Sequence, residues 1–248
     1  MSKHFELMQK IEQDEPHFSE LRPVPIVPLP SRKGIRNGRT RWAHDEALRL
    51  VQQVFLLQMK APPRVVVFAS IDHGNGCSQM CTSVAEILSK SARRPVCLVE
   101  GNFRSPALPD LFGTTNHLGL TDALHQNGPI SLFAKLVNED NLWLLSSGSL
   151  AADSPSLLTA DRLSDRVAEL RQEFEFVIID APPLTQYSDA LALGQLSDGL
   201  VMVLQADSTR REAASMAAAT LRSAKIPILA AVLNKRTFPI PDAIYKRL

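Results

Sequence analysis

The sequence lacks any apolar run of the length that crosses a bilayer. Its longest purely apolar runs, such as Val65 to Ala69 and Gly199 to Leu204, are far shorter than the ~20 residues of a membrane-spanning helix. The opening residues mix acids and bases and contain no apolar core, which is unlike a secretory signal. We therefore expect a protein of the cytoplasm.

The chain also has few cysteines and few aromatic residues, and its net charge is small. The 248 residues include three cysteines without the spacing of a disulfide framework, which is typical of a reducing compartment. Aromatic residues make up 6% of the chain and the net charge is +1, so composition selects no strongly charged partner. The basic side chains that do cluster lie in one proline-broken segment, which predicts a solvated tether and no nucleic-acid surface, with a weak contact to acidic lipid headgroups as the alternative: Arg22, Arg32, Lys33, Arg36, Arg39 and Arg41.

Apolar spacing and proline content divide the chain into four parts. Residues 1–15 predict a short docking helix, and residues 16–41 predict a proline-rich, basic linker. Residues 42–238 predict one domain that opens with an amphipathic helix over 45–59, with Asp45 and Glu46 in its first turn. Residues 239–248 remain as a short tail.

Short apolar runs alternate with helical patterns throughout the large domain. Continuous apolar runs of this length are typical of strands buried on both faces, so we expect an α/β fold with a mostly parallel sheet and helices on both faces. Ligands of such sheets bind at the carboxyl ends of the strands. The expected strands are 65–70, 96–100, 142–146, 176–180, 200–205 and 228–233, and the expected helices are 78–91, 118–125, 161–174, 188–196 and 210–224.

The first expected strand runs into residues 70–79, SIDHGNGCSQ, which have the spacing of a phosphate-binding loop. Gly74 and Gly76 allow the backbone to approach an anion, and free N–H groups at the start of the next helix would point at a phosphate. Ser78 stands at the magnesium-ligand place, but Cys77 replaces the lysine. A plain turn from strand to helix is the alternative interpretation.

A metal site is a second interpretation of the same stretch. His73, Cys77 and Cys81 follow four-residue spacing, which could place three ligands together. However, His73 lies before the helix and no fourth ligand is evident. We therefore interpret the cysteines as small buried residues.

A series of motifs recurs in the order found in one family. The strand EFVIIDAPP ends in Asp180 like a Walker B strand, and the other motifs are PVCLVEGNFRSPALPDLFG (95–113), GLTDAL (119–124), LLSSGSLAADSPSLL (144–158), DGLVMVLQADSTRR (198–211) and ILAAVLNK (228–235). The ordered set resembles the bacterial tyrosine kinases of capsule and exopolysaccharide assembly. Their deviant P-loop group, with a P-loop NTPase-like fold, also contains the chromosome-partition and division-site ATPases.

The resemblance implies a nucleotide site, a metal site, an oligomer interface and a partner. ATP would contact Gly74, Asn75, Gly76, Cys77, Ser78, Gln79 and Asn234, the last at the base, while Ser78 and Asp180 would hold Mg²⁺. Helix residues Glu46 and Arg49 match the family's ring-forming helix, which predicts a homo-oligomer, although Gln52 replaces a second arginine. The expected partner is a membrane-anchored polysaccharide co-polymerase, which would hold the chain at the inner face of the membrane.

Departures from the family pattern predict a degenerate member. The missing lysine removes a contact worth about 1.5–3 kcal/mol, so ATP affinity is expected to fall roughly ten- to a hundredfold. The second acidic strand ends Glu100-Gly101-Asn102 instead of Asp-x-Asp, which leaves Glu100, Asn102 and Asp180 as vestigial catalytic residues. The tail has the single tyrosine Tyr245 as a phosphorylation candidate.

Two other functions remain open from the sequence. An active ATPase or tyrosine autokinase would need a substitute cation, for which Arg104, Arg210 and Arg211 are the candidates. A partition- or division-type positioning protein would carry a signature lysine where this chain has Asp72, which argues against that function. We favour a regulatory subunit of exopolysaccharide assembly.

Overall fold

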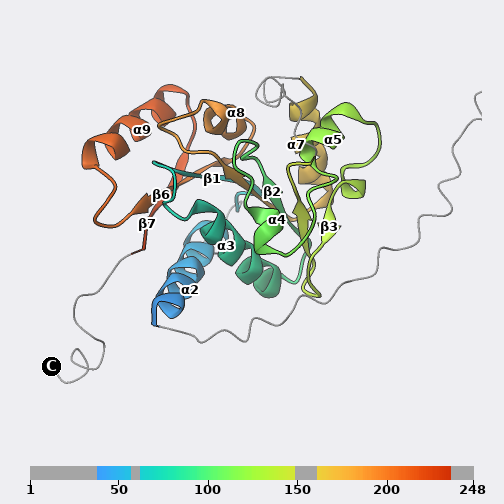
Figure 1. Ribbon diagram of the computed structural model, residues 1–248, viewed down its shortest axis with the longest axis horizontal. Helices are drawn as coiled ribbons and strands as arrows, with labels where there is room; N and C mark the ends of the chain where they lie inside the picture. Colours follow the sequence, from blue (N-terminus) through green and yellow to red (C-terminus); the bar gives the residue numbers. More distant parts are fainter. Residues whose placement is uncertain (1–37, 57–61, 149–160, 236–248) are drawn as a thin grey trace, which may run out of the picture.

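A seven-stranded sheet organises the chain (Figure 1). The computed structural model describes residues 38–56, 62–148 and 161–235, so the expected docking helix, most of the linker and the tail lie outside the described residues. In chain order the elements are α2 (Gly38–Val51), the π-helical η2 (Gln52–Leu56), β1 (Val65–Ser70), α3 (Cys77–Ala92), β2 (Val96–Glu100), α4 (Leu108–Leu111), α5 (Leu120–His125), the 3₁₀ turn η3 (Ile130–Leu132), β3 (Lys135–Leu136), β4 (Leu142–Leu145), α7 (Asp161–Glu173), β5 (Phe176–Ala181), α8 (Asp189–Gln195), β6 (Gly199–Gln205), α9 (Arg211–Ser223) and β7 (Ile228–Asn234).

The expected mostly parallel sheet is confirmed. Its strands lie in the order β3-β4-β2-β5-β1-β6-β7, and the pairs are parallel except at the edge, where β3 runs antiparallel to β4. Every residue of β1, β2 and β5 is buried, as their unbroken apolar runs predict. The carboxyl ends of these three central strands therefore meet at one edge of the molecule.

Alternate residues of β1 supply two separate cores. Val65, Val67 and Ala69 join the core that packs beneath α5, α7, α8 and α9. Val66 and Phe68 join the opposite core, which is completed by α2, η2 and α3. Figure 1 shows α2 beside α3. This alternation follows from the two-residue period of a strand, and it places helices on both faces.

The helix α2 differs from the bounds of 45–59 expected for it. It begins at Gly38, so Asp45 and Glu46 do not lie in its first turn, and the helix extends into the segment expected to be linker. The last proline before it is Pro30, and no residue between them forbids a helix. A π-helical stretch continues it through Leu56.

Three short elements were not expected from the sequence: α4, η3 and β3. None is longer than four residues, so none carries a periodic pattern that could be recognised. Across the described parts of the chain, no helix combines the length and the apolar character needed to cross a membrane.

Candidate functional site

The glycine loop joins β1 to α3 at the carboxyl edge of the sheet. Gly74 and Gly76 have φ angles of +79° and +85°, in the left-handed region that glycine adopts without strain. α3 starts at Cys77, immediately after the loop. The N–H groups of its first turn have no carbonyl acceptor within the helix, so they are available to an anion.

The end of β7 holds this loop in place. The Asn234 side chain donates from Nδ2 to the Asn75 carbonyl oxygen at 2.9 Å and to the Gly76 carbonyl oxygen at 3.5 Å. Lys235 donates from Nζ to the Gly74 carbonyl oxygen. Asn234, expected to contact a nucleotide base, therefore has its amide group engaged by the loop itself.

Lys235 is a cation at the loop that the sequence analysis did not single out. It ends the quoted motif ILAAVLNK, directly after Asn234, and this adjacency was the one available signal. The three arginines considered as substitutes lie elsewhere. Arg104 is paired with Asp189 (Nε to Oδ2, 3.2 Å), and its guanidinium carbon lies 4.2 Å from the centre of the Tyr187 ring.

Arg210 and Arg211 are exposed where α9 begins, and the structure gives neither a contact with the loop. The loop aspartate, Asp72, accepts a hydrogen bond from the Thr185 hydroxyl at 3.0 Å, and its N–H donates to Asn75 Oδ1 at 2.9 Å. Asp72 therefore ties the loop to the segment that follows β5.

Two buried carboxyl groups lie in register on neighbouring strands. Glu100 at the end of β2 is in register with Asp180 in β5, and they are 0% and 1% exposed. Glu100 Oε2 accepts hydrogen bonds from the N–H groups of Ala107 and Leu108, at 2.8 and 2.9 Å. This carboxyl group therefore organises the turn into α4, a structural role that the sequence did not indicate.

Asn102, the other altered position of the acidic strand, also serves the backbone. Its Oδ1 accepts a hydrogen bond from the Ser105 N–H at 3.3 Å, and its own N–H donates to Glu100 Oε1 at 3.3 Å. Both substituted acidic positions thus stabilise the loop between β2 and α4.

Burial perturbs both carboxyl groups. It raises the pKa of Asp180 to about 6, while side-chain contacts with Ser78, Cys77 and Cys81 act in the opposite direction. Burial likewise raises the pKa of Glu100 to about 8, and the neighbouring Asp180 charge adds to the rise. The pair therefore resists carrying two negative charges.

The Glu100 pKa predicts a stability that falls as pH rises. Because the folded state raises this pKa above the ordinary 4.5, the stabilisation is complete below pH 4.5 and is lost as pH rises through about 8. The free energy of unfolding in urea is expected to fall over this window by at most about 1.4 kcal/mol per pH unit for one proton. Glu100→Gln should flatten the curve between about pH 6 and 8, above the range in which the raised pKa of Asp180 contributes, whereas Glu139→Gln, at an exposed site, should leave the curve unchanged. An unchanged slope in Glu100→Gln contradicts the assignment.

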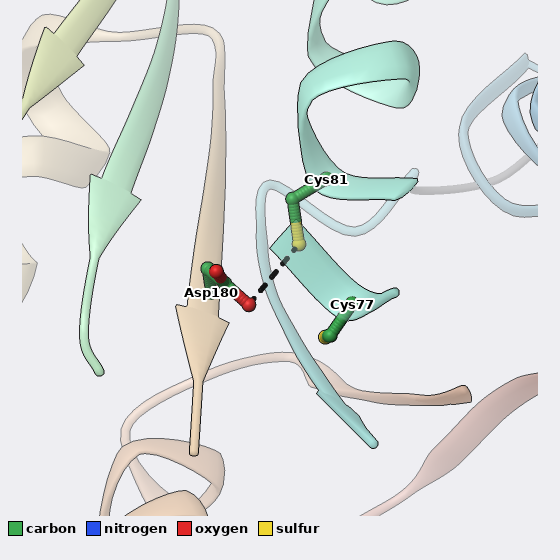
Figure 2. Close-up of side chains that lie close together, drawn as sticks. All are labelled: Cys77, Cys81 and Asp180. Carbon is green, nitrogen blue, oxygen red and sulfur yellow. Dashed lines mark hydrogen bonds between the residues drawn. The ribbon is translucent and has the colours of Figure 1, made fainter. Parts of the chain in front are cut away.

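The cysteines of α3 lie beside Asp180 (Figure 2). The Cys81 thiol donates to Asp180 Oδ1 at 3.7 Å, and Cys77, Cys81 and Asp180 are all buried. His73 is exposed in the loop, so the histidine of the suggested metal set does not join the cysteines. The expectation that the cysteines are buried is confirmed.

The residues present fit a phosphate and Mg²⁺ in part. Ser78 and Asp180 supply the oxygen ligands that Mg²⁺ prefers, and Asp180 Oδ2 is buried without a hydrogen-bond partner among the described residues. The loop supplies N–H groups for a phosphate. The first residue of α3 supplies no positive charge, because it is Cys77, whose pKa is raised to about 11, and the ammonium group at the loop is that of Lys235.

The expected oligomer contacts lie on the helix surface. Arg49 is exposed and Glu46 is half-buried on α2, and they form an ion pair with each other, Oε1 of Glu46 to Nη1 of Arg49, at 3.5 Å. Tyr245, the expected phosphorylation candidate, lies outside the described residues.

No family model matches the chain. Among known proteins it is 28% identical over 177 residues to the tyrosine-protein kinase YwqD of Bacillus subtilis, which covers 71% of this chain and 73% of that protein. It is 25% identical over 173 residues to the tyrosine-protein kinase CpsD of Streptococcus pneumoniae, covering 69% and 76%. The match to the tyrosine-protein kinase wzc of Salmonella typhimurium spans 64% of this chain but 22% of that longer protein.

Solved structures share the fold. The kinase domain of the Escherichia coli tyrosine kinase ETK superposes with a TM-score of 0.74 at 17% identity, covering 94% of this chain and 89% of that domain. The septum site-determining protein MinD of Pyrococcus horikoshii, solved with Mg-ADP, gives a TM-score of 0.58 at 18% identity and covers 74% and 76%. The sequence matches identify bacterial tyrosine-protein kinases as homologues of this chain, and the solved structures show that it shares their fold.

Proposed function

We propose that the chain is a non-catalytic, regulatory member of this kinase family, which acts through contacts in capsule or exopolysaccharide biosynthesis or export. One observation carries the proposal. The residue that opens α3 is Cys77, whose side chain is buried and whose pKa of about 11 keeps the thiol neutral at physiological pH. The position that supplies a cation in the family's loop therefore supplies none.

The distribution of charge at the site supports a loss of phosphoryl-transfer activity. Phosphoryl transfer depends on positive charge placed at the phosphates, and removal of one such contact typically lowers the rate by about 10² or more. Here Glu100 is engaged by the N–H groups of Ala107 and Leu108, and Asn102 carries no charge. The acidic strand thus has a structural role in place of a catalytic one.

Lys235 favours a second candidate function, an active ATP-dependent autokinase. Its ammonium group contacts the Gly74 carbonyl oxygen and so places one cation at the loop, from the residue that follows β7 and not from α3. A phosphate bound by the loop could recruit this group. The two candidates differ in whether the chain binds and cleaves ATP.

The expected partner follows from the family resemblance. A membrane-anchored polysaccharide co-polymerase would hold this chain at the cytoplasmic face of the membrane, and the exposed face of α2 with Glu46 and Arg49 would contact further copies. This assembly role requires the fold and its surfaces but no turnover.

Calorimetric titration with ATP and Mg²⁺, together with transfer of labelled phosphate, tests the proposal. We expect weak or no ATP binding and no phosphotyrosine on the purified chain, since the loop lacks its lysine. Tyrosine phosphorylation or ATP cleavage that Asp180→Ala abolishes contradicts the non-catalytic role. If Lys235→Met also abolishes that activity, the second candidate replaces the first.

A further inference from the structure

The thiols of Cys77 and Cys81 and the carboxyl group of Asp180 form a compact cluster between α3 and β5, and we propose that it binds a thiophilic divalent cation such as Zn²⁺ (Figure 2). One ligand atom from each residue lies within 4.8 Å of the other two, and all three residues are buried. The proposal concerns a cation held by the protein itself, so it goes beyond the regulatory function and does not depend on it.

The spacing of the cluster suits a tetrahedral metal. Cys77 and Cys81 are four residues apart on α3, so they lie on one face of the helix, as paired ligands of helical zinc sites do. With Zn–S bonds near 2.3 Å and Zn–O bonds near 2.1 Å, neighbouring ligand atoms are about 3.5–3.8 Å apart. The Cys81 Sγ to Asp180 Oδ1 distance is 3.7 Å, which already matches.

Asp180 carries a free ligand atom. Its Oδ2 is fully buried and accepts no hydrogen bond from any residue that the structure describes. An unpartnered buried carboxylate oxygen is costly unless a proton or a cation compensates it. This oxygen is therefore a second observation, independent of helix spacing, that favours a bound cation.

The ligand chemistry separates this site from a magnesium site. Thiolates are soft ligands that select zinc-like metals, whereas Mg²⁺ takes oxygen ligands and keeps several waters. Three protein ligands would leave a fourth position for water or an anion. Because Asp180 belongs to both sites, a metal on the cysteines would remove this carboxylate from Mg²⁺.

Cobalt titration of the reduced, full-length chain tests the proposal, because Co²⁺ bound to thiolates absorbs strongly in the near ultraviolet and visible range. We expect one Co²⁺ per chain with thiolate absorption, and its displacement by Zn²⁺. Loss of an outer-shell partner typically weakens metal binding by about tenfold to a hundredfold. Cys77→Ala and Cys81→Ala each remove a direct ligand, so each should weaken Co²⁺ binding by more than this. Cys97→Ala is the matched control, because Cys97 is also buried but lies in β2 outside the cluster.

Two results would overturn the proposal. One is the absence of thiolate absorption at stoichiometric Co²⁺, and the other is unchanged affinity in both cluster variants while their circular dichroism remains that of the parent chain. Native mass spectrometry of the unvaried chain with Zn²⁺ alone gives a measurement that needs no variant. Retention of one zinc supports the site and recovery of the metal-free mass alone rejects it, whatever the result of the ATP experiments.

Discussion

Replacement of Cys77 by lysine is expected to tighten binding of Mg-ATP by about ten- to a hundredfold, because a hydrogen bond to a charged group contributes about 1.5–3 kcal/mol. Cys77 opens α3 directly after Gly76, so a lysine at this position starts from the place that the family's loop provides for it. The measurement is calorimetric titration of Cys77→Lys against the parent chain. Any gain in phosphate transfer should be larger, about 10² or more, because transfer depends on the same charge.

Cys77→Ala is the matched control for this experiment, because it removes the thiol without adding a cation. We expect its ATP affinity to equal that of the parent. If Cys77→Ala tightens binding as much as Cys77→Lys, the thiol itself obstructs the site and the missing charge is not the cause. If neither variant changes affinity although both remain folded, the loop does not bind a triphosphate, and the electrostatic account of this site is wrong.

Gly76→Ala is expected to destabilise the protein by about 2–4 kcal/mol. About 1–2 kcal/mol of this comes from the left-handed backbone, since φ is +85° at Gly76. The remainder comes from a steric clash, because an added Cβ would lie 2.5 Å from Asn234 Nδ2 and would break the hydrogen bonds that hold the loop. Urea unfolding measures the change.

Gly74→Ala separates the two contributions. Its φ is +79°, but an added Cβ would meet no atom within 4 Å, so this variant carries the backbone cost alone. We expect Gly76→Ala to be destabilised by about 1–2 kcal/mol more than Gly74→Ala, the difference being the lost contact with Asn234. Equal destabilisation of the two variants would show that Asn234 contributes nothing to the stability of the loop.

Most of the fold follows from local pattern. The first two expected strands, 65–70 and 96–100, match β1 and β2 at both ends, because a buried parallel strand needs an unbroken apolar run and turn residues bound it. The antiparallel edge strand β3 could not be predicted. It has two residues, Lys135 and Leu136, and is defined by its pairing with β4, not by its own sequence.

The candidate site was predicted less completely than the fold. The position of the loop and of Asp180 follows from the rule that ligands bind at the carboxyl ends of parallel strands. The partners of individual side chains do not follow from such a rule. Glu100 accepts hydrogen bonds from the turn into α4, Asn234 donates to the backbone of the glycine loop, and Arg104 pairs with Asp189. Each contact either joins residues distant in the sequence or lies in a turn that has no periodic pattern.

The contacts at the end of β7 have a mechanical consequence. Asn234 and Lys235 are consecutive, and both reach back over about 160 residues of sequence to the same three-residue stretch of the glycine loop. The thirteen residues that follow Lys235 in the sequence, Tyr245 among them, are thus covalently joined to the two side chains that clamp this stretch. A displacement of Asn234 or Lys235 would therefore be transmitted to the carbonyl groups of the glycine loop, which couples the end of β7 to the candidate site.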